Sequence, residues 1–142
     1  MKGVPRKKTN GTIPHREQLL GLYMGAATLH QLFPQVGQLR IELTFDDPNG
    51  RIPPPSSQAH TLFAAAPAFF RFACPCADCD GDFDLTEAVT SLVSGSTGRK
   101  RAVSLGGHLA CCGVRFRDHA VHQAACSMRL NFQLLSEPSP AS

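Results

Sequence analysis

The residues of this chain that are best suited to chemistry are its six cysteines, which fall into two groups. They are Cys74, Cys76 and Cys79 in the first group and Cys111, Cys112 and Cys126 in the second. A structural zinc ion is held tetrahedrally by four thiolate or imidazole ligands, usually two from each of two tight turns. The two groups therefore predict a metal site in which four of the six thiols bind one Zn²⁺ ion.

The first group offers two possible ligand pairs. Cys76 and Cys79 are separated by two residues and are followed by Gly81, a spacing typical of a zinc knuckle. Cys74 and Cys79, separated by four residues, form the other pair. In both pairs Gly81 would allow the backbone to turn beneath the sulfur atoms.

The second group offers Cys111 or Cys112, with Gly113 in the knuckle position, and then Cys126. Two alternatives to a zinc site remain. Isolated buried cysteines pack as small hydrophobic side chains, but clustered thiols are more typical of metal ligands. An iron–sulfur cluster would use the same ligands, although the dense cysteine run of ferredoxins is missing.

Two kinds of enzyme are also compatible with these residues. A zinc hydrolase needs an open coordination position, and His108, His119 and His122 lie close enough in the sequence to suggest one. Histidines in polar surroundings are, however, typical of solvated surface groups. Alternatively, Cys76 could act in a thiol oxidoreductase, although no βαβ pattern surrounds it.

The positive charge of the chain is concentrated at its N-terminal end. The formal net charge is +3, but Lys2, Arg6, Lys7 and Lys8 supply four positive charges. The rest of the chain is nearly neutral, which is unlike the basic surface of most nucleic-acid-binding domains. Nucleic-acid binding is the second interpretation, with these residues as the contacts: Arg99, Lys100, Arg101, Arg115 and Arg117.

The length and composition predict a single soluble domain. The 142 residues are 42% apolar and 18% charged, which is compatible with one modest core. We expect a disordered basic tail over residues 1–14, one zinc-binding domain over residues 15–136 and a C-terminal tail over residues 137–142. No apolar run has the length of a membrane helix and no signal peptide is recognisable, so we expect a cytoplasmic protein.

Hydrophobic periodicity predicts two helices and four strands. Apolar residues recur at helical spacing over residues 16–33 and again over residues 85–94, where Asp84 can cap the helix and Glu87 completes a capping box. Strands are expected over residues 39–45, 68–73, 102–110 and 127–135. Residues 51–58 contain three consecutive prolines and predict a polyproline-like connector.

These elements predict an α+β fold. The four strands would form an antiparallel sheet, and the helix of residues 85–94 would pack on one of its faces. A zinc ion would join the ends of the strands. Because a structural zinc ion contributes on the order of 10 kcal/mol to folding, it would compensate for a modest core.

The order of these motifs resembles that of small, uncharacterised bacterial proteins of the zinc-ribbon type. The matching segments are Cys74-Pro75, Cys79-Asp80-Gly81, Phe83-Asp84-Leu85, Cys111-Cys112-Gly113 and Cys126-Ser127-Met128-Arg129-Leu130. The resemblance covers residues 68–135 and implies a zinc-ribbon-like antiparallel sheet. It also implies Cys74, Cys79, Cys111 and Cys126 as the ligands, with Cys76 and Cys112 as additional thiols. It implies no activity.

The sequence thus favours a non-enzymatic zinc-binding module with a structural site of four cysteines. Such a module would mediate an interaction with a macromolecular partner. We expect this partner to be a protein, whose identity the sequence does not reveal, and not a membrane. Nucleic-acid binding, zinc-dependent hydrolysis and thiol oxidoreduction are the alternative functions.

Overall fold

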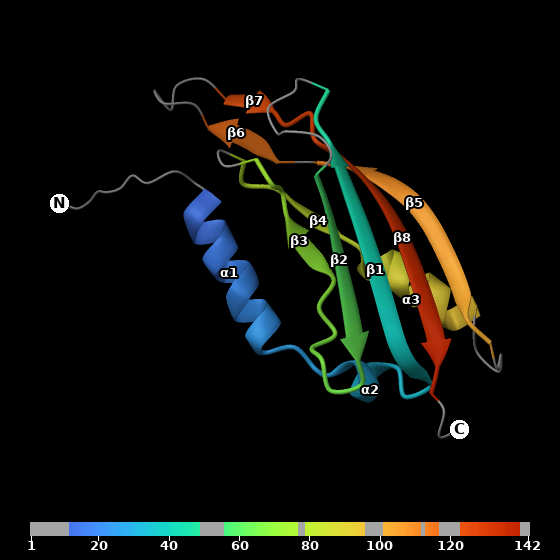
Figure 1. The fold of residues 1–142 in the computed structure, drawn as a ribbon. Helices are drawn as coiled ribbons and strands as arrows, with labels where there is room; N and C mark the ends of the chain where they lie inside the picture. The colour runs from blue at the N-terminus through green and yellow to red at the C-terminus, as the bar shows by residue number, and fades with distance from the viewer. Residues whose placement is uncertain are drawn as a thin grey trace.

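A computed structural model describes residues 12–48, 56–76, 79–95, 101–111, 113–116 and 123–139 of the chain, with the backbone alone for residues 12–16, 114–116 and 123–125. The fold is α+β, as predicted, and is built around an antiparallel sheet of four strands (Figure 1). Within the described residues, none of the helices is both long enough and apolar enough to cross a membrane.

The sheet has the strand order β2-β1-β8-β5. These strands are β1 (Val36–Asp46), β2 (Ser56–Phe63), β5 (Val103–Ala110) and β8 (Arg129–Pro138). Buried and exposed side chains alternate along β1 and β8, so one face of the sheet carries the core and the other faces solvent. The strands predicted over residues 39–45, 102–110 and 127–135 are therefore confirmed. β8 extends through residues 137 and 138, which the sequence pattern places in the C-terminal tail.

The strand predicted over residues 68–73 is not part of this sheet. Only residues 71–73 form a strand, β3 (Arg71–Ala73), which pairs with β4 (Asp82–Asp84) in a separate hairpin. The fourth strand of the sheet is β2, which pairs with β1. Residues 56–58 belong to β2 and not to a polyproline-like connector, and the prolines of that prediction lie outside the described residues. A third strand pair consists of β6 (Val114–Phe116) and β7 (Gln123–Ala125).

The single helix predicted over residues 16–33 is wrong, because the structure has two helices there. α1 (Thr12–Met24) begins inside the predicted tail, and α2 (Leu29–Leu32) is a separate short turn of helix. Between them, backbone pairing with residues 66–68 replaces helical hydrogen bonds: Leu29 N donates to Ala66 O at 2.8 Å and Ala68 N donates to Ala27 O at 2.7 Å. Thr28 then starts α2 with a capping box.

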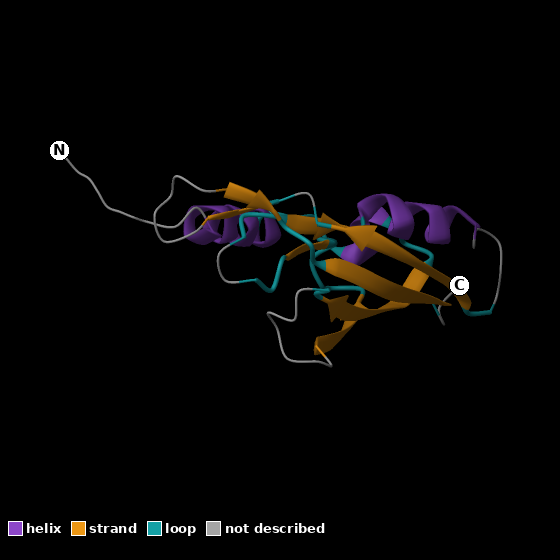
Figure 2. Ribbon diagram, turned by 90° about the horizontal axis from the view of Figure 1, so that it is seen from above, coloured by secondary structure: helices purple, strands orange, loops and turns teal. Residues whose placement is uncertain are grey.

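The predicted helix of residues 85–94 is confirmed as α3 (Thr86–Gly95), and Asp84 Oδ1 accepts a hydrogen bond from Thr86 N at 2.9 Å. α3 packs against β5 and β8 on the apolar face of the sheet (Figure 2). The β3–β4 hairpin continues this covering layer. The core contains the inward side chains of the sheet, those of α3 and five cysteines, and its largest fully buried members include Phe83, Leu39, Ile41, Leu43, Leu85, Met128 and Leu134.

Candidate metal centre

The first cysteine turn connects β3 to β4. Cys74 directly follows β3, and Cys79-Asp80-Gly81 directly precedes β4. Cys74 N donates to Gly81 O at 3.0 Å, which closes the turn. Gly81 N donates to Cys79 Sγ at 3.3 Å, and an N–H donor of this kind stabilises a thiolate.

The second turn repeats this arrangement with residues far away in the sequence. Cys111-Cys112-Gly113 directly precedes β6, and Cys126 directly follows β7. Gly113 N donates to Cys111 Sγ at 3.3 Å, and Cys126 N donates to Gly113 O at 3.1 Å. Cys111 therefore corresponds to Cys79, and Cys126 corresponds to Cys74. Each half consists of a two-stranded antiparallel pair that supplies one cysteine after a strand and one in a Cys-x-Gly turn.

The four sulfur atoms of these two turns lie together in the interior. Cys74 Sγ is 3.7 Å from Cys126 Sγ, and Cys79 Sγ is 3.6 Å from Cys111 Sγ. All four sulfur atoms lie within 4.8 Å of one another, and all four residues are buried. A Zn–S bond of about 2.3 Å in tetrahedral geometry requires sulfur atoms about 3.8 Å apart. The four thiols could therefore hold one tetrahedral metal ion.

The two turns approach each other through their glycines. A Cβ atom on Gly81 would lie 2.5 Å from Cys111 Sγ and 2.9 Å from the Cα atom of Gly113. A Cβ atom on Gly113 would lie 2.5 Å from the Cα atom of Gly81. Both approaches are too close for any side chain, so glycine at these two positions allows the four sulfur atoms to converge.

The buried thiols influence one another's ionisation. Hydrogen bonding, chiefly from the Cys74 thiol, lowers the pKa of Cys111 to about 6. The same hydrogen bond, together with burial, raises the pKa of Cys74, and burial raises the pKa of Cys79. Of these three thiols in the metal-free cluster, Cys111 is therefore the one that ionises most readily.

The other predicted site residues are placed differently. Cys76 is 4% exposed and lies in the core, but it does not belong to the group of four. Burial raises the pKa of Cys76 to about 12. His108 lies on the exposed face of β5. The alternative ligand Cys112 lies outside the described residues. So do His119, His122, Arg99, Lys100, Arg117 and the side chain of Arg115, which belong to the enzymatic and nucleic-acid hypotheses. Arg101 is exposed just before β5.

One contact near the site was not predicted from the sequence. Asp47 is a buried carboxylate after β1, and its Oδ1 atom accepts a hydrogen bond from Ser127 Oγ at 2.9 Å. Ser127 directly follows Cys126. The contact joins the end of β1 to the last cysteine of the cluster. In the sequence, Asp47 belongs to a run of turn-forming residues, and nothing there relates it to a segment 80 residues away.

Comparison with known proteins adds no family or relative. No protein-family model matches the chain, no curated protein matches it, and no solved structure matches it.

Proposed function

We propose that this protein is a non-enzymatic zinc-binding module in which Cys74, Cys79, Cys111 and Cys126 bind one structural Zn²⁺ ion. The observation that supports this most strongly is the convergence of four buried sulfur atoms within 4.8 Å of one another. Structural zinc sites are closed tetrahedral sites rich in cysteine. The resemblance of the cysteine turns to those of zinc-ribbon-type proteins agrees with this proposal.

The spacing of the sulfur atoms favours a single ion over an iron–sulfur cluster. A cluster places several iron and sulfide atoms between its cysteine ligands, which requires a wider cage than 4.8 Å allows. Zinc is proposed over a single iron ion because four cysteines in two glycine-containing turns are the common ligand set of structural zinc.

Three features support a structural role over catalysis. Four thiolate ligands would fill the tetrahedron and leave no open position for water or a substrate. The ligands are continuous with the hydrophobic core, so the ion would join the ends of the two hairpins to the sheet. Cys76 is buried and its pKa is raised to about 12, whereas a reactive thiol needs exposure and a low pKa.

We further propose that the module binds a macromolecular partner through α1. The exposed fractions of Leu20, Leu22 and Met24 are 60%, 46% and 75%. Leu20 and Met24 are four residues apart and therefore share one face of the helix. Exposed apolar side chains that lie side by side are typical of protein–protein interaction sites.

Elemental analysis combined with thiol titration tests the metal proposal. We expect one zinc ion per chain and four thiols that react only after chelation. Cys79→Ser should lose the zinc, whereas the control Cys76→Ala should keep it, because Cys76 is outside the group of four. A protein purified without metal and with six reactive thiols would refute the proposal.

Site-specific photo-crosslinking tests the partner proposal separately. A photoreactive residue at Met24 should give a covalent adduct in cells of the source organism. The same residue at Ser94, an exposed position on α3, serves as the control. If position 24 gives no adduct beyond that of position 94, α1 is not a partner-binding surface, while the metal proposal is unaffected.

A further inference from the structure

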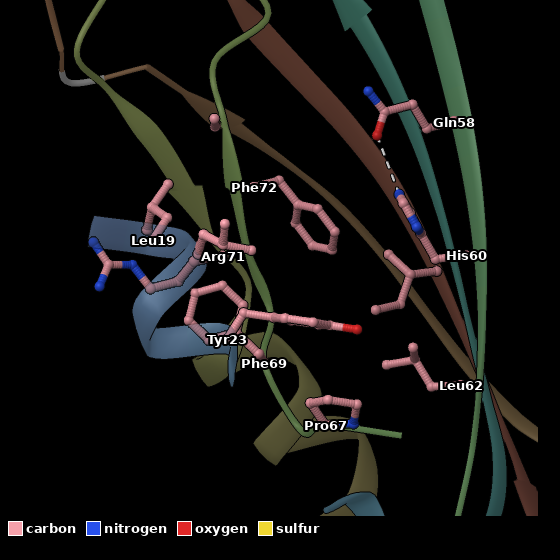
Figure 3. Close-up of a pocket in the computed structure, with 12 residues that line it drawn as sticks. Leu19, Tyr23, Gln58, His60, Leu62, Pro67, Phe69, Arg71 and Phe72 are labelled. Atoms are coloured by element: carbon pink, nitrogen blue, oxygen red, sulfur yellow. Dashed lines mark hydrogen bonds between the residues drawn. The ribbon is translucent and has the colours of Figure 1, made fainter. Parts of the chain in front are cut away.

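A cavity of about 500 Å³ lies between α1, β2 and the segment that leads into β3 (Figure 3). This volume is within the usual range for sites that bind small molecules. None of the described residues that line the cavity is a cysteine, so it is separate from the group of four thiols. α3 packs against β5 and β8, whereas the cavity is lined by residues of α1 and β2.

Aromatic rings form much of the cavity wall. Tyr23 packs edge-on against Phe69, with ring centroids 6.0 Å apart and an interplanar angle of 81°. His60 lies against Phe72, with centroids 5.2 Å apart and an angle of 35°. Aliphatic side chains of α1 and β2 complete the wall. Rings in such arrangements favour a flat aromatic ligand.

Polar groups interrupt this apolar lining at two places. On β1 the inner face carries leucine, isoleucine and phenylalanine, but on β2 it carries Gln58 and His60. His60 Nε2 lies 3.1 Å from Gln58 Oε1, and because a carbonyl oxygen can only accept, Nε2 is the donor. In the tautomer that carries its proton on Nε2, the Nδ1 atom of His60 is an acceptor. Across the cavity, the Tyr23 hydroxyl points toward the space beside His60 and Leu62 (Figure 3).

The cavity offers little attraction for a charged ligand. Among the described residues that line the cavity, Arg71 is the one with a permanent charge. Its guanidinium group points away from the other lining residues in Figure 3 and makes two hydrogen bonds to Asp82, at 2.9 and 3.2 Å. An ion would therefore lose water without gaining a free counter-charge from the described lining residues.

We propose that this cavity binds a small, neutral, flat aromatic molecule that carries one hydroxyl group. The aromatic body would lie among the rings of Tyr23, Phe69 and Phe72. The hydroxyl would donate to His60 Nδ1 and accept from the Tyr23 hydroxyl. This binding site goes beyond the structural role of the metal centre and does not depend on it.

A titration with 2-naphthol tests this proposal, because the probe has the required body and a single hydroxyl group. The chain contains no tryptophan and one tyrosine, Tyr23, which lines the cavity. Binding should quench Tyr23 fluorescence and raise the anisotropy of naphthol fluorescence with the same saturation curve. The anion 2-naphthoate has a similar body and should bind at least tenfold more weakly.

Three variants distinguish the hydrogen bonds of the ligand hydroxyl from non-specific hydrophobic binding. Tyr23→Phe and His60→Leu should each weaken 2-naphthol binding about three- to tenfold, the value of one hydrogen bond, while leaving naphthalene binding unchanged. Met24→Ala, on the same helix but outside the cavity, should bind 2-naphthol as the wild type does. Absence of saturable quenching in the wild type, equal binding of 2-naphthoate, or equal weakening in Met24→Ala would each overturn the proposal.

Discussion

Arg71 and Asp82 form a two-point ion pair across β3 and β4, with Arg71 Nε 2.9 Å from Asp82 Oδ2 and Nη2 3.2 Å from Oδ1. These two strands enter and leave the first cysteine turn. The hydrogen bonds that Arg71 donates to Asp82 raise the pKa of Arg71, as expected for a paired guanidinium group. The ion pair therefore holds the two strands together just beside Cys74 and Gly81.

Breaking this ion pair should destabilise the protein measurably. We expect Asp82→Asn to lower the free energy of unfolding by about 1 kcal/mol, because a bidentate, partly buried pair is stronger than an ordinary surface pair. The control is Glu42→Gln, which removes the exposed Arg40–Glu42 pair on the outer face of the sheet. Its effect should be below about 0.5 kcal/mol. Denaturant unfolding of both variants measures the difference, and equal effects would contradict the role given to Asp82.

The close approach of the two turns predicts that neither glycine tolerates a side chain. Gly81→Ala and Gly113→Ala should each abolish or strongly weaken zinc binding, because the new Cβ atom would overlap the opposite turn. Gly95→Ala is the matched control, since a Cβ atom there would meet nothing within 4 Å and alanine favours the helix end. Its zinc content should be normal and its stability equal or slightly higher. Elemental analysis measures the zinc content of each variant. Normal zinc binding by Gly113→Ala would refute the packing argument.

The lowered pKa of Cys111 predicts a break in the pH dependence of zinc affinity. On folding, the pKa of the Cys111 thiol falls from 9.0 to about 6. Ionisation of Cys111 therefore stabilises the folded state fully above pH 9, and this stabilisation is lost as the pH falls through 6. Zinc binding displaces the protons of its ligands. Above about pH 6, Cys111 is already ionised, so zinc binding releases fewer than four protons. Below about pH 6, Cys111 is protonated and zinc binding releases one more proton.

Competition with a chelator over a range of pH values measures this effect. We expect log Kd for zinc to rise as the pH falls, with a steeper slope below about pH 6. A uniform slope across that range would show that Cys111 is not ionised in the metal-free protein.

The position of Phe83 predicts that the first turn depends on the core. Phe83 is 1% exposed and packs against Phe45 with ring centroids 5.6 Å apart. Phe83→Ala should therefore cost about 3–5 kcal/mol. Phe63, at the end of β2, is 59% exposed, so Phe63→Ala should cost less than about 1 kcal/mol. Thermal unfolding of the two variants, both loaded with zinc, should separate them by many degrees.

The elements predicted correctly are those whose burial pattern is expressed within one segment. β1 and β8 alternate because one face of each packs on the core, and α3 carries its apolar residues at helical spacing. The sequence pattern places β3 in the wrong sheet, because a strand of three residues has little pattern of its own. In the structure β3 pairs with β4, and the hydrogen bond from Cys74 N to Gly81 O closes the turn between them. α1 ends at Met24 because a distant loop pairs with residues 27–29, which no local pattern reveals.

The candidate site shows the same division between local and distant information. The two Cys-x-Gly turns could be recognised from the sequence, because the glycine requirement is local. The choice between Cys74 and Cys76 could not be made from spacing, since both lie within reach of Cys79. In the structure, the pairing of β3 with β4 places Cys74 opposite Gly81 and beside Cys126, while Cys76 enters the core.

The central position of β8 has a consequence for folding. β8 is the last strand of the described residues, yet it pairs with both β1 and β5. The β1–β2 hairpin and β5 are joined in the sheet only through β8, and Cys126 lies three residues before it. Neither the sheet nor the group of four sulfur atoms can therefore form until residues 126–138 have taken their places.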